Sequence, residues 1–247
     1  MAKEFLDLKN YEPTPTHYFI KMLEDKGILQ LLMTQNIDNL ESKTGINMDK
    51  VVQAHGANVG ASCSKCKHAY PRDLLDKHLE DQVILRCDQM VETEDPKDEL
   101  KKEKIKCNAP VKPNIVFFGE KMNPKFFWGW ERITNLDINN HQPGKDGPKY
   151  DDGGCDLMIT IGTGLAVFPF SATVNQPSRG TPNVLINLSN CESEGFDFKD
   201  LYEYPERLLL KGYCDEVVQK LAKDVGWEKD LQNLCKNKPI VKEKIKK

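Results

Sequence analysis

Hydrophobic residues gather in four short runs along the chain, and helical patterns lie between and after them. The runs span residues 28–34, 156–164, 183–189 and 207–212, and their length favours buried strands. The clearest helical pattern covers 215–227, where one face carries Val217, Val218, Leu221, Ala222 and Val225. Apolar strands that alternate with helices predict an α/β fold with a parallel sheet covered on both faces.

A first helix is predicted over residues 14–27. Thr14 is a suitable N-cap, Pro15 fits the first helical position, and Gly27 lies just past the end.

Three of the four apolar runs end in small or polar residues. These ends are Gln35-Asn36-Ile37-Asp38, Gly162-Thr163-Gly164 and Asn187-Leu188-Ser189. Ligands of parallel sheets bind at the carboxyl ends of the strands, so this placement suits a nucleotide. Taken alone, the first of these stretches equally fits an Asx turn that caps the following helix.

Composition and charge exclude several classes of partner. The net charge is −3 over 247 residues, too small to predict direct binding to nucleic acid or to a membrane surface. Apolar runs stay well below the roughly 18 residues of a membrane span. The N-terminus has no apolar core of a secretory signal, so we expect an intracellular protein, cytoplasmic or nuclear.

Residues 55–119 interrupt the α/β pattern with cysteines and charges. We therefore expect two domains, with 1–54 and 120–247 forming the sheet domain and 55–119 an inserted module. Within the module, 88–106 is mostly charged and is predicted to be an exposed, partly disordered excursion. Residues 137–154 are predicted to form a second loop, and the lysine-rich tail a solvated end.

Four of the eight cysteines have a metal-binding pattern. Cys63 and Cys66 form a Cys-x-x-Cys knuckle, and Cys87 and Cys107 follow at longer intervals. Four thiolates close a tetrahedral zinc site, which makes the metal structural. The alternative is that Cys87 and Cys107 are ordinary thiols, with His68 and His78 as substitute ligands. Three others, Cys155, Cys191 and Cys235, are predicted to be packing residues.

His55 precedes the first cysteine pair by eight residues. A complete four-thiolate shell does not need it, so it is either a structural histidine or a proton acceptor, since neutral imidazole is available near pH 7.

Three segments in order carry a resemblance to a family. They are "TQNIDNLE" (34–41), "QAHG" (53–56) followed by Cys-x-x-Cys, and "VKPNIVFFGE" (111–120). With "ITIGTGLAVFPFSATV", "LINLSN" and "GYCDE" further on, the chain resembles the sirtuins, NAD-dependent protein deacetylases, and is most similar to class I. The resemblance implies a Rossmann-like NAD domain with an inserted zinc module, and makes Cys87 and Cys107 the third and fourth ligands.

The resemblance also implies a reaction and roles. The acetyl oxygen of an acetyl-lysine attacks the nicotinamide ribose carbon, nicotinamide leaves, and the acetyl group ends on ADP-ribose. His55 is the implied base, Asn36 and Asp38 hold the ribose and nicotinamide, and Asn187 and the backbone of Cys214 meet the adenosine. The remaining implied contacts are Gln35, Ile37, Gly162, Thr163, Gly164, Leu188 and Ser189 for NAD, and Val116, Phe117, Phe118 and Gly119 for the peptide.

Two departures from the family pattern matter. Gly164 stands where the family usually has serine, which removes a hydroxyl contact. (Separately, Asp215 is expected to be the N-cap of its own helix.) The family's first strand and Gly-Ala-Gly-x-Ser loop do not occur in these residues. Three hypotheses follow: a deacetylase acting on histones or other acetylated proteins, a non-catalytic module that binds acyl-peptides, or an ADP-ribosyltransferase.

Overall fold

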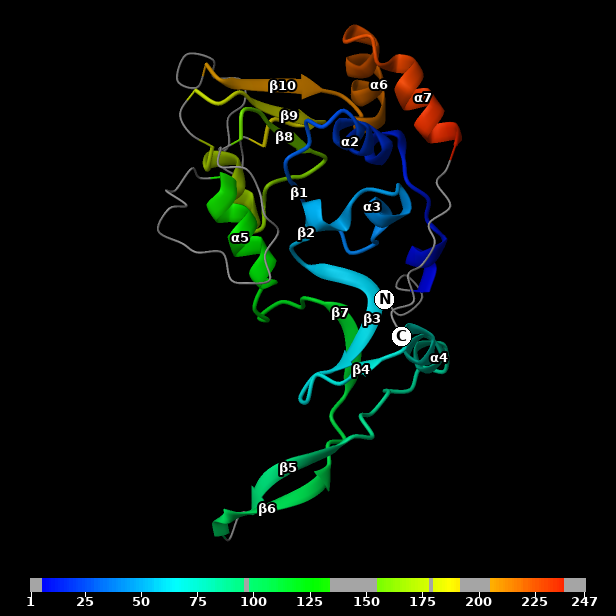
Figure 1. Ribbon diagram of the computed structural model, residues 1–247, viewed down its shortest axis with the longest axis vertical. Coiled ribbons are helices and arrows are strands. Elements are labelled where there is room, and N and C mark those ends of the chain that lie inside the picture. Colours follow the sequence, from blue (N-terminus) through cyan, green and yellow to red (C-terminus); the bar gives the residue numbers. More distant parts are fainter. Residues whose placement is uncertain (1–5, 96–97, 134–154, 178–179, 192–204, 238–247) are drawn as a thin grey trace. The chain divides into compact units, whose positions relative to one another are not determined.

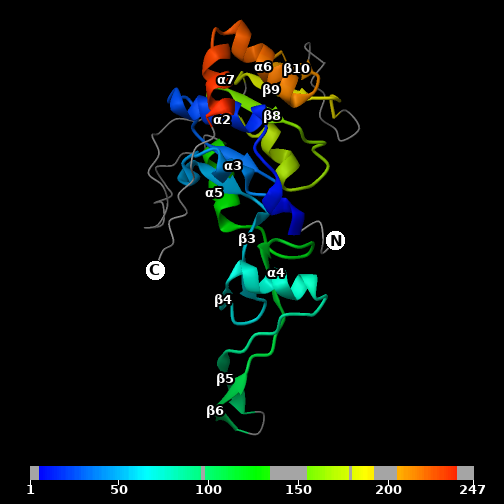
Figure 2. The same ribbon diagram turned by 90° about the vertical axis from the view of Figure 1, so that its right-hand side faces the viewer.

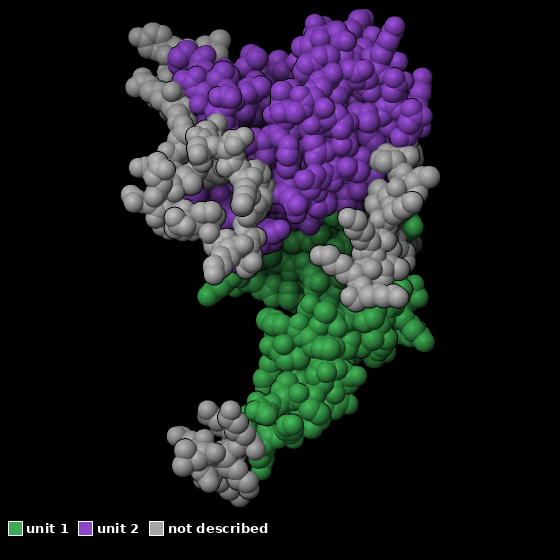
Figure 3. All heavy atoms as spheres, viewed as in Figure 1, with its two compact units in different colours: residues 1–11, 36–39, 55–122 green, residues 12–35, 40–54, 123–247 purple. Residues whose placement is uncertain are grey.

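The computed structural model describes residues 6–95, 98–133, 155–177, 180–191 and 205–237. The chain forms two compact units (Figure 3). Unit 1 contains residues 1–11, 36–39 and 55–122, and unit 2 contains 12–35, 40–54 and 123–247. The domain division expected from the sequence stays a prediction.

The strands of unit 2 are parallel (Figure 1). One sheet has the order β10-β9-β8, and the other pairs β1 with β2. Their bounds are Leu32–Thr34 (β1), Val51–Gln53 (β2), Met158–Ile161 (β8), Asn183–Asn187 (β9) and Arg207–Lys211 (β10). The predicted parallel α/β fold is confirmed, with the strands distributed over two sheets. Four of the strands lie within the predicted apolar runs and are shorter than them, whereas β2 was not predicted.

Helices cover the three-stranded sheet on one face (Figure 2). The helices of unit 2 are α2 (Pro15–Asp25), α3 (Leu40–Lys43), α5 (Pro124–Ile133), α6 (Cys214–Asp224) and α7 (Glu228–Lys236), with 3₁₀ turns η2 (Met48–Lys50) and η4 (Phe170–Asn175). Ile186 of β9 packs into a core formed by Tyr18, Phe19, Met22, Val218, Ala222 and Leu231. Its neighbour Leu185 packs on the opposite side with Leu165, Val174 and Cys191, as the alternation of a strand requires.

The first helix begins and ends as predicted. Thr14 is the N-cap of α2, Pro15 occupies its first position, and Gly27 has φ +73°. The role expected for Asp215 was wrong, because α6 begins at Cys214 after Tyr213. Asp215 instead lies in the first turn of α6 and serves α2: its Oδ1 accepts hydrogen bonds from the Thr16 N–H (3.0 Å), Thr16 Oγ1 (2.6 Å) and Thr14 Oγ1 (2.9 Å).

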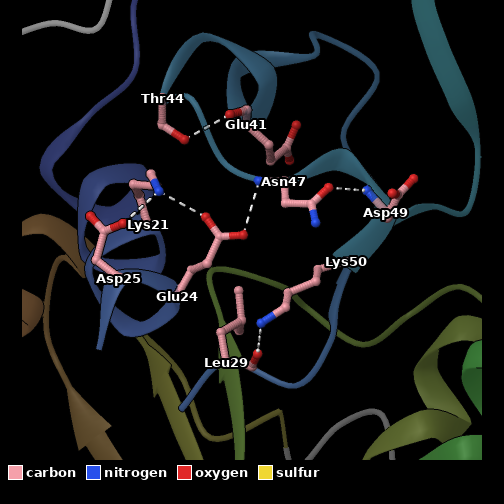
Figure 4. Close-up of polar contacts among 9 residues, drawn as sticks. All are labelled: Lys21, Glu24, Asp25, Leu29, Glu41, Thr44, Asn47, Asp49 and Lys50. Atoms are coloured by element: carbon pink, nitrogen blue, oxygen red, sulfur yellow. Dashed lines mark hydrogen bonds and ion pairs between the residues drawn. The ribbon is translucent and has the colours of Figure 1, made fainter. Parts of the chain in front are cut away.

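Polar contacts tie the connection between β1 and β2 to its surroundings (Figure 4). Glu24 of α2 accepts a hydrogen bond from Lys21 Nζ on one carboxylate oxygen and from the Asn47 N–H on the other, both at 2.9 Å. Just before β2, Lys50 Nζ donates to the Leu29 carbonyl at 2.8 Å. These contacts fix the start of β2, the strand that leads directly to His55.

Unit 1 contains an antiparallel sheet of order β4-β3-β7. Its elements are η1 (Leu8–Asn10), β3 (Gly56–Cys63), β4 (Ala69–Tyr70), α4 (Arg72–Glu80), β5 (Met90–Asp95), β6 (Asp98–Lys106) and β7 (Val111–Ile115). The core of this unit gathers around Ala61, Leu75, Leu85 and Val111.

The prediction of partial disorder in 88–106 was wrong for the residues described. β5 and β6 form an antiparallel hairpin in which Glu92 stands opposite Lys104. Opposite charges facing each other across two strands stabilise the pairing. The predicted exposure holds: Met90 is 60% and Ile105 42% exposed.

Two other expectations lie outside the described residues, namely the whole of the loop at 137–154 and most of the lysine-rich tail. Within the part of the chain that the structure describes, every helix is too short or too polar to cross a bilayer.

Replacing Asp215 by alanine should destabilise unit 2. The variant removes a carboxylate that accepts three hydrogen bonds, which costs about 1–2 kcal/mol of unfolding free energy after allowing for its partial exposure. Chemical denaturation checks this, with Asp224→Ala as control, because Asp224 forms only an exposed ion pair with Lys220. A loss no larger than that of the control contradicts the assigned role.

The stability lost in Asp215→Ala should depend on pH. Burial raises the pKa of Asp215, but the hydrogen bonds from Thr16 and Thr14 outweigh it, so the pKa lies below the ordinary value of 3.8. A depressed carboxyl pKa stabilises the fold above the unfolded-state pKa, and this stability is lost as the pH falls through the folded-state pKa. The stability difference between wild type and Asp215→Ala should therefore be full at neutral pH and shrink below pH 3.8.

Candidate active site and metal centre

The four cysteines chosen from the sequence converge in unit 1. The Sγ atoms of Cys63, Cys66, Cys87 and Cys107 all lie within 4.8 Å of one another. Two pairs, Cys63–Cys107 and Cys66–Cys87, are separated by 3.6 and 3.5 Å. Tetrahedral zinc with bonds of about 2.3 Å places its sulfur ligands roughly 3.8 Å apart, so the cluster fits that ion. Zinc held there is closed to substrate and therefore structural.

The chemistry of the thiols supports a metal. Burial opposes ionisation of Cys63, yet the N–H groups of Cys66 and Lys65 donate to its Sγ and lower its pKa to about 6. The His68 N–H favours the Cys66 thiolate, but burial and the neighbouring thiols raise the pKa of Cys66 to about 12, so without a cation the four thiols do not all ionise. A thiolate is the form that binds zinc. Beyond the ligands, Tyr70 Oη lies 3.1 Å from Cys87 Sγ and 2.6 Å from Asp88 Oδ1, and so connects the cluster to an outer carboxylate.

Among the described residues, the cluster consists of thiols alone. His68 instead packs edge-on against Tyr70, and His78 Nδ1 contacts the Leu74 carbonyl at 2.8 Å. The substitute-ligand alternative is therefore not needed.

His55 is held at the start of β3 by its backbone. Its carbonyl accepts a hydrogen bond from the Val116 N–H at 2.8 Å, next to the pairing of Gly56 with Ile115. Gly56 has φ +73°, and a Cβ there would lie 2.3 Å from the Asn114 carbonyl oxygen, so only glycine fits. The His55 side chain is half-buried. Across the strand pairing, the backbone of His55 contacts Val116, the first residue of the segment predicted to bind peptide.

Residues 36–39 also belong to unit 1. The Ile37 carbonyl accepts a hydrogen bond from the Asn58 N–H at 2.8 Å, which ties this segment to β3 three residues after His55. Asn36 is exposed and Asp38 half-buried. His55, Asn36 and Asp38 thus belong to one unit, in which the segment 36–39 is joined to β3 through Ile37.

The predicted peptide segment follows β7 directly. Val116 is half-buried, while Phe117 is 43% and Phe118 101% exposed. Gly119 adopts φ +85°, and the Glu120 N–H donates to the Phe117 carbonyl at 2.9 Å, which closes a turn. The segment therefore presents aromatic side chains to solvent.

The predicted cofactor residues of unit 2 meet at the carboxyl ends of three strands. Thr163, after β8, donates from Oγ1 to Gln35 Oε1 after β1 at 3.2 Å. Asn187, at the end of β9, donates from Nδ2 to the Thr163 carbonyl at 2.9 Å. In this structure the Thr163 hydroxyl is engaged with Gln35 and the Leu165 N–H, so it must exchange a partner to bind a ligand.

The glycines beside Thr163 leave room for a ligand. Gly162 has φ +63°, and a Cβ added to it would lie 3.3 Å from Cys214 Sγ. The start of α6 therefore lies at the same sheet edge as Thr163. Gly164 is exposed with open space around it. Leu188 and Ser189 are also exposed. Open glycine backbone beside polar strand ends fits the adenosine and phosphate parts of a dinucleotide.

Cys191 belongs to this edge, although the sequence marked it only as a packing residue. It is buried, as predicted, but its Sγ lies 3.4 Å from both the Thr163 carbonyl and Asn187 Nδ2. Its position four residues after Asn187 was the only available signal.

Together, these features define a class: an α/β protein with a ligand edge on parallel strands and an inserted four-cysteine module. A family model described as the Sir2 family matches residues 1–139. The chain belongs to the Sir2, or sirtuin, family.

Curated relatives agree along nearly all of the chain. NAD-dependent deacetylase sir2A of Dictyostelium discoideum is 33% identical over 92% of this chain and 38% of its own length. NAD-dependent protein deacetylase sirtuin-2 of Danio rerio is 32% identical over 92% of this chain and 54% of its own length. NAD-dependent histone deacetylase sir2 of Schizosaccharomyces pombe is 30% identical, with coverages of 95% and 47%. The chain therefore spans 38–54% of the length of these three relatives.

A solved structure described as "The Structural basis for Sirtuin Substrate affinity" superposes with a TM-score of 0.65. It covers 89% of this chain and 75% of the other, at 23% identity, and supports the fold.

The purified protein should contain one zinc ion per chain. Cys107→Ser should lose it, because removing one thiolate opens the shell and leaves an incomplete site. Elemental analysis gives the readout, and Cys235→Ser is the matched control, since Cys235 packs against the helical core of unit 2. Equal zinc in the two variants contradicts the assigned cluster.

Proposed function

We propose that the protein is an NAD-dependent protein-lysine deacetylase that acts on acetylated proteins, histones among them. The observation that carries this proposal is the hydrogen bond between the His55 carbonyl and the Val116 N–H. It places the candidate base beside the candidate peptide segment within one unit. Family membership and the names of the relatives support the same activity.

In this proposal, unit 1 binds the acyl-lysine and moves the proton. An extended peptide lies along the segment that follows β7, and Phe117 and Phe118 flank the lysine stem. Bound NAD supplies an electrophilic ribose carbon and a nicotinamide leaving group. Asn36 and Asp38 orient the ribose and the nicotinamide amide, and neutral His55 accepts a proton from a ribose hydroxyl.

Unit 2 holds the adenosine end in this proposal. Asn187 faces the adenosine ribose, Thr163 donates a hydrogen bond, and Gly162 and Gly164 let the backbone approach. The backbone of Cys214 meets the adenine, and Gln35, Leu188 and Ser189 make the remaining NAD contacts of this unit, while Ile37 contributes one from unit 1. Zinc keeps a structural role, because four thiolates leave it no open position.

Replacing His55 by alanine should reduce nicotinamide release from NAD and an acetyl-lysine peptide by at least about 100-fold, the usual contribution of a general base. Zinc content should not change, because His55 is outside the thiol cluster. His78→Ala is the matched control, since that imidazole lies half-buried on α4, where its Nδ1 contacts the Leu74 carbonyl.

The outcomes separate the three hypotheses. Peptide binding without nicotinamide release by the parent chain favours a binding module and contradicts the proposal. Labelled adenine nucleotide that stays on protein favours ADP-ribosyl transfer. Release that His55→Ala leaves unchanged removes His55 from the chemistry.

Gly164→Ser should strengthen NAD binding. The site has open space for a side chain, and a hydroxyl there adds one hydrogen bond, which is equivalent to about fivefold in affinity. Calorimetric titration with NAD measures the change, and Gly164→Ala separates the hydroxyl from the added carbon. An affinity gain equal in both variants contradicts the role of the hydroxyl.

A further inference from the structure

Lys112 of β7 gathers three groups around its ammonium. Its Nζ donates to the Ile115 carbonyl at 2.6 Å and to Glu120 Oε2 at 2.9 Å, and lies 4.9 Å from the centre of the Phe117 ring. Its side chain is 25% exposed, which limits competition from water. A cation held by a carboxylate, a carbonyl and an aromatic face is fixed in one position.

Glu120 closes the same segment from the other end. The Oε2 atom that receives Lys112 also accepts a hydrogen bond from the Phe117 N–H at 3.0 Å. The Glu120 N–H donates to the Phe117 carbonyl, so both backbone groups of Phe117 are bonded to Glu120. The hydrogen bonds from Lys112 and from the Phe117 N–H hold the pKa of Glu120 below its ordinary value, and it stays ionised at neutral pH.

These contacts define the shape of the exposed turn. Phe117 is attached to Glu120 through its backbone and to Lys112 through its ring, while Phe118 at the tip is 101% exposed. These contacts restrain the turn and keep the Phe118 side chain exposed to solvent. Such ordering before binding reduces the entropy that a ligand must overcome.

We propose that Lys112 and Glu120 are positioning residues that preorganise the segment Val116–Gly119 for an extended acyl-lysine peptide. The inference rests on the proposed peptide site but adds two residues to it. Neither side chain needs to touch the reacting atoms, since their effect passes through the backbone and ring of Phe117. The pair should therefore set affinity for peptide and leave affinity for NAD alone.

The test compares Lys112→Met, which keeps the aliphatic stem and removes the charge, with Lys112→Arg, which keeps a cation. Fluorescence anisotropy measures the Kd of a labelled acetyl-lysine peptide, and nicotinamide release gives KM for peptide and for NAD. Lys112→Met should weaken peptide binding about fivefold, with kcat and the KM for NAD unchanged, and Lys112→Arg should restore most of it. Lys77→Met, an exposed lysine on α4, is the matched control.

A double-mutant cycle with Glu120→Ala tests the pair as a unit. Since Glu120→Ala also removes the hydrogen bond from the Phe117 N–H, the double variant should bind peptide about as weakly as Glu120→Ala alone if Lys112 acts mainly through Glu120. Zinc content and circular dichroism confirm that each variant folds.

Each result decides the question. A peptide Kd for Lys112→Met equal to wild type, or an equal change in the KM for NAD, overturns the inference while the proposed function stands. Peptide binding that depends on Lys112 without turnover supports the inference and overturns the deacetylase proposal. A wild-type chain that binds no peptide overturns both.

Discussion

The register between β3 and β7 is the constraint on which the candidate site depends. At one end of the pairing Cys63 stands opposite Val111, and at the other Gly56 stands opposite Ile115, with an irregularity between Gly56 and Ala61. A slip of one residue would exchange the two faces of a strand. It would turn Cys63 away from the other thiols and separate His55 from Val116. The cysteine cluster and the contact between His55 and Val116 therefore depend on the same strand alignment.

Much of this arrangement could be predicted from the sequence because the signals are local. Thr14, Pro15 and Gly27 specify the ends of α2 through backbone requirements that act within one turn. Uninterrupted apolar runs predicted most of the parallel strands. The spacing of Cys63 and Cys66 predicted a metal-binding knuckle. The hairpin β5–β6 was missed because its strands carry charges, and their favourable pairing appears only when Glu92 is aligned with Lys104.

Contacts between distant residues could not be predicted in the same way. Asp215 has the position of an N-cap for its own helix, yet its carboxylate serves Thr14 and Thr16, about 200 residues earlier in the chain. Lys112 and Glu120 stand eight residues apart, and only the turn at Gly119 brings their side chains together. In both cases the chain must already be folded before the partner of the charged group is defined.

The two units divide the predicted binding residues between them. The boundary falls between Gln35 and Asn36 and again between Ala54 and His55. The segment Val116–Gly119, His55 and the four cysteines therefore belong to one unit, whereas Thr163 and Asn187 belong to the other. Under the proposed function, peptide binding depends on contacts within unit 1, while turnover also requires the strand ends of unit 2. The difference between an acyl-peptide binding module and a deacetylase lies, in physical terms, in whether the edge formed by Gln35, Thr163 and Asn187 binds NAD.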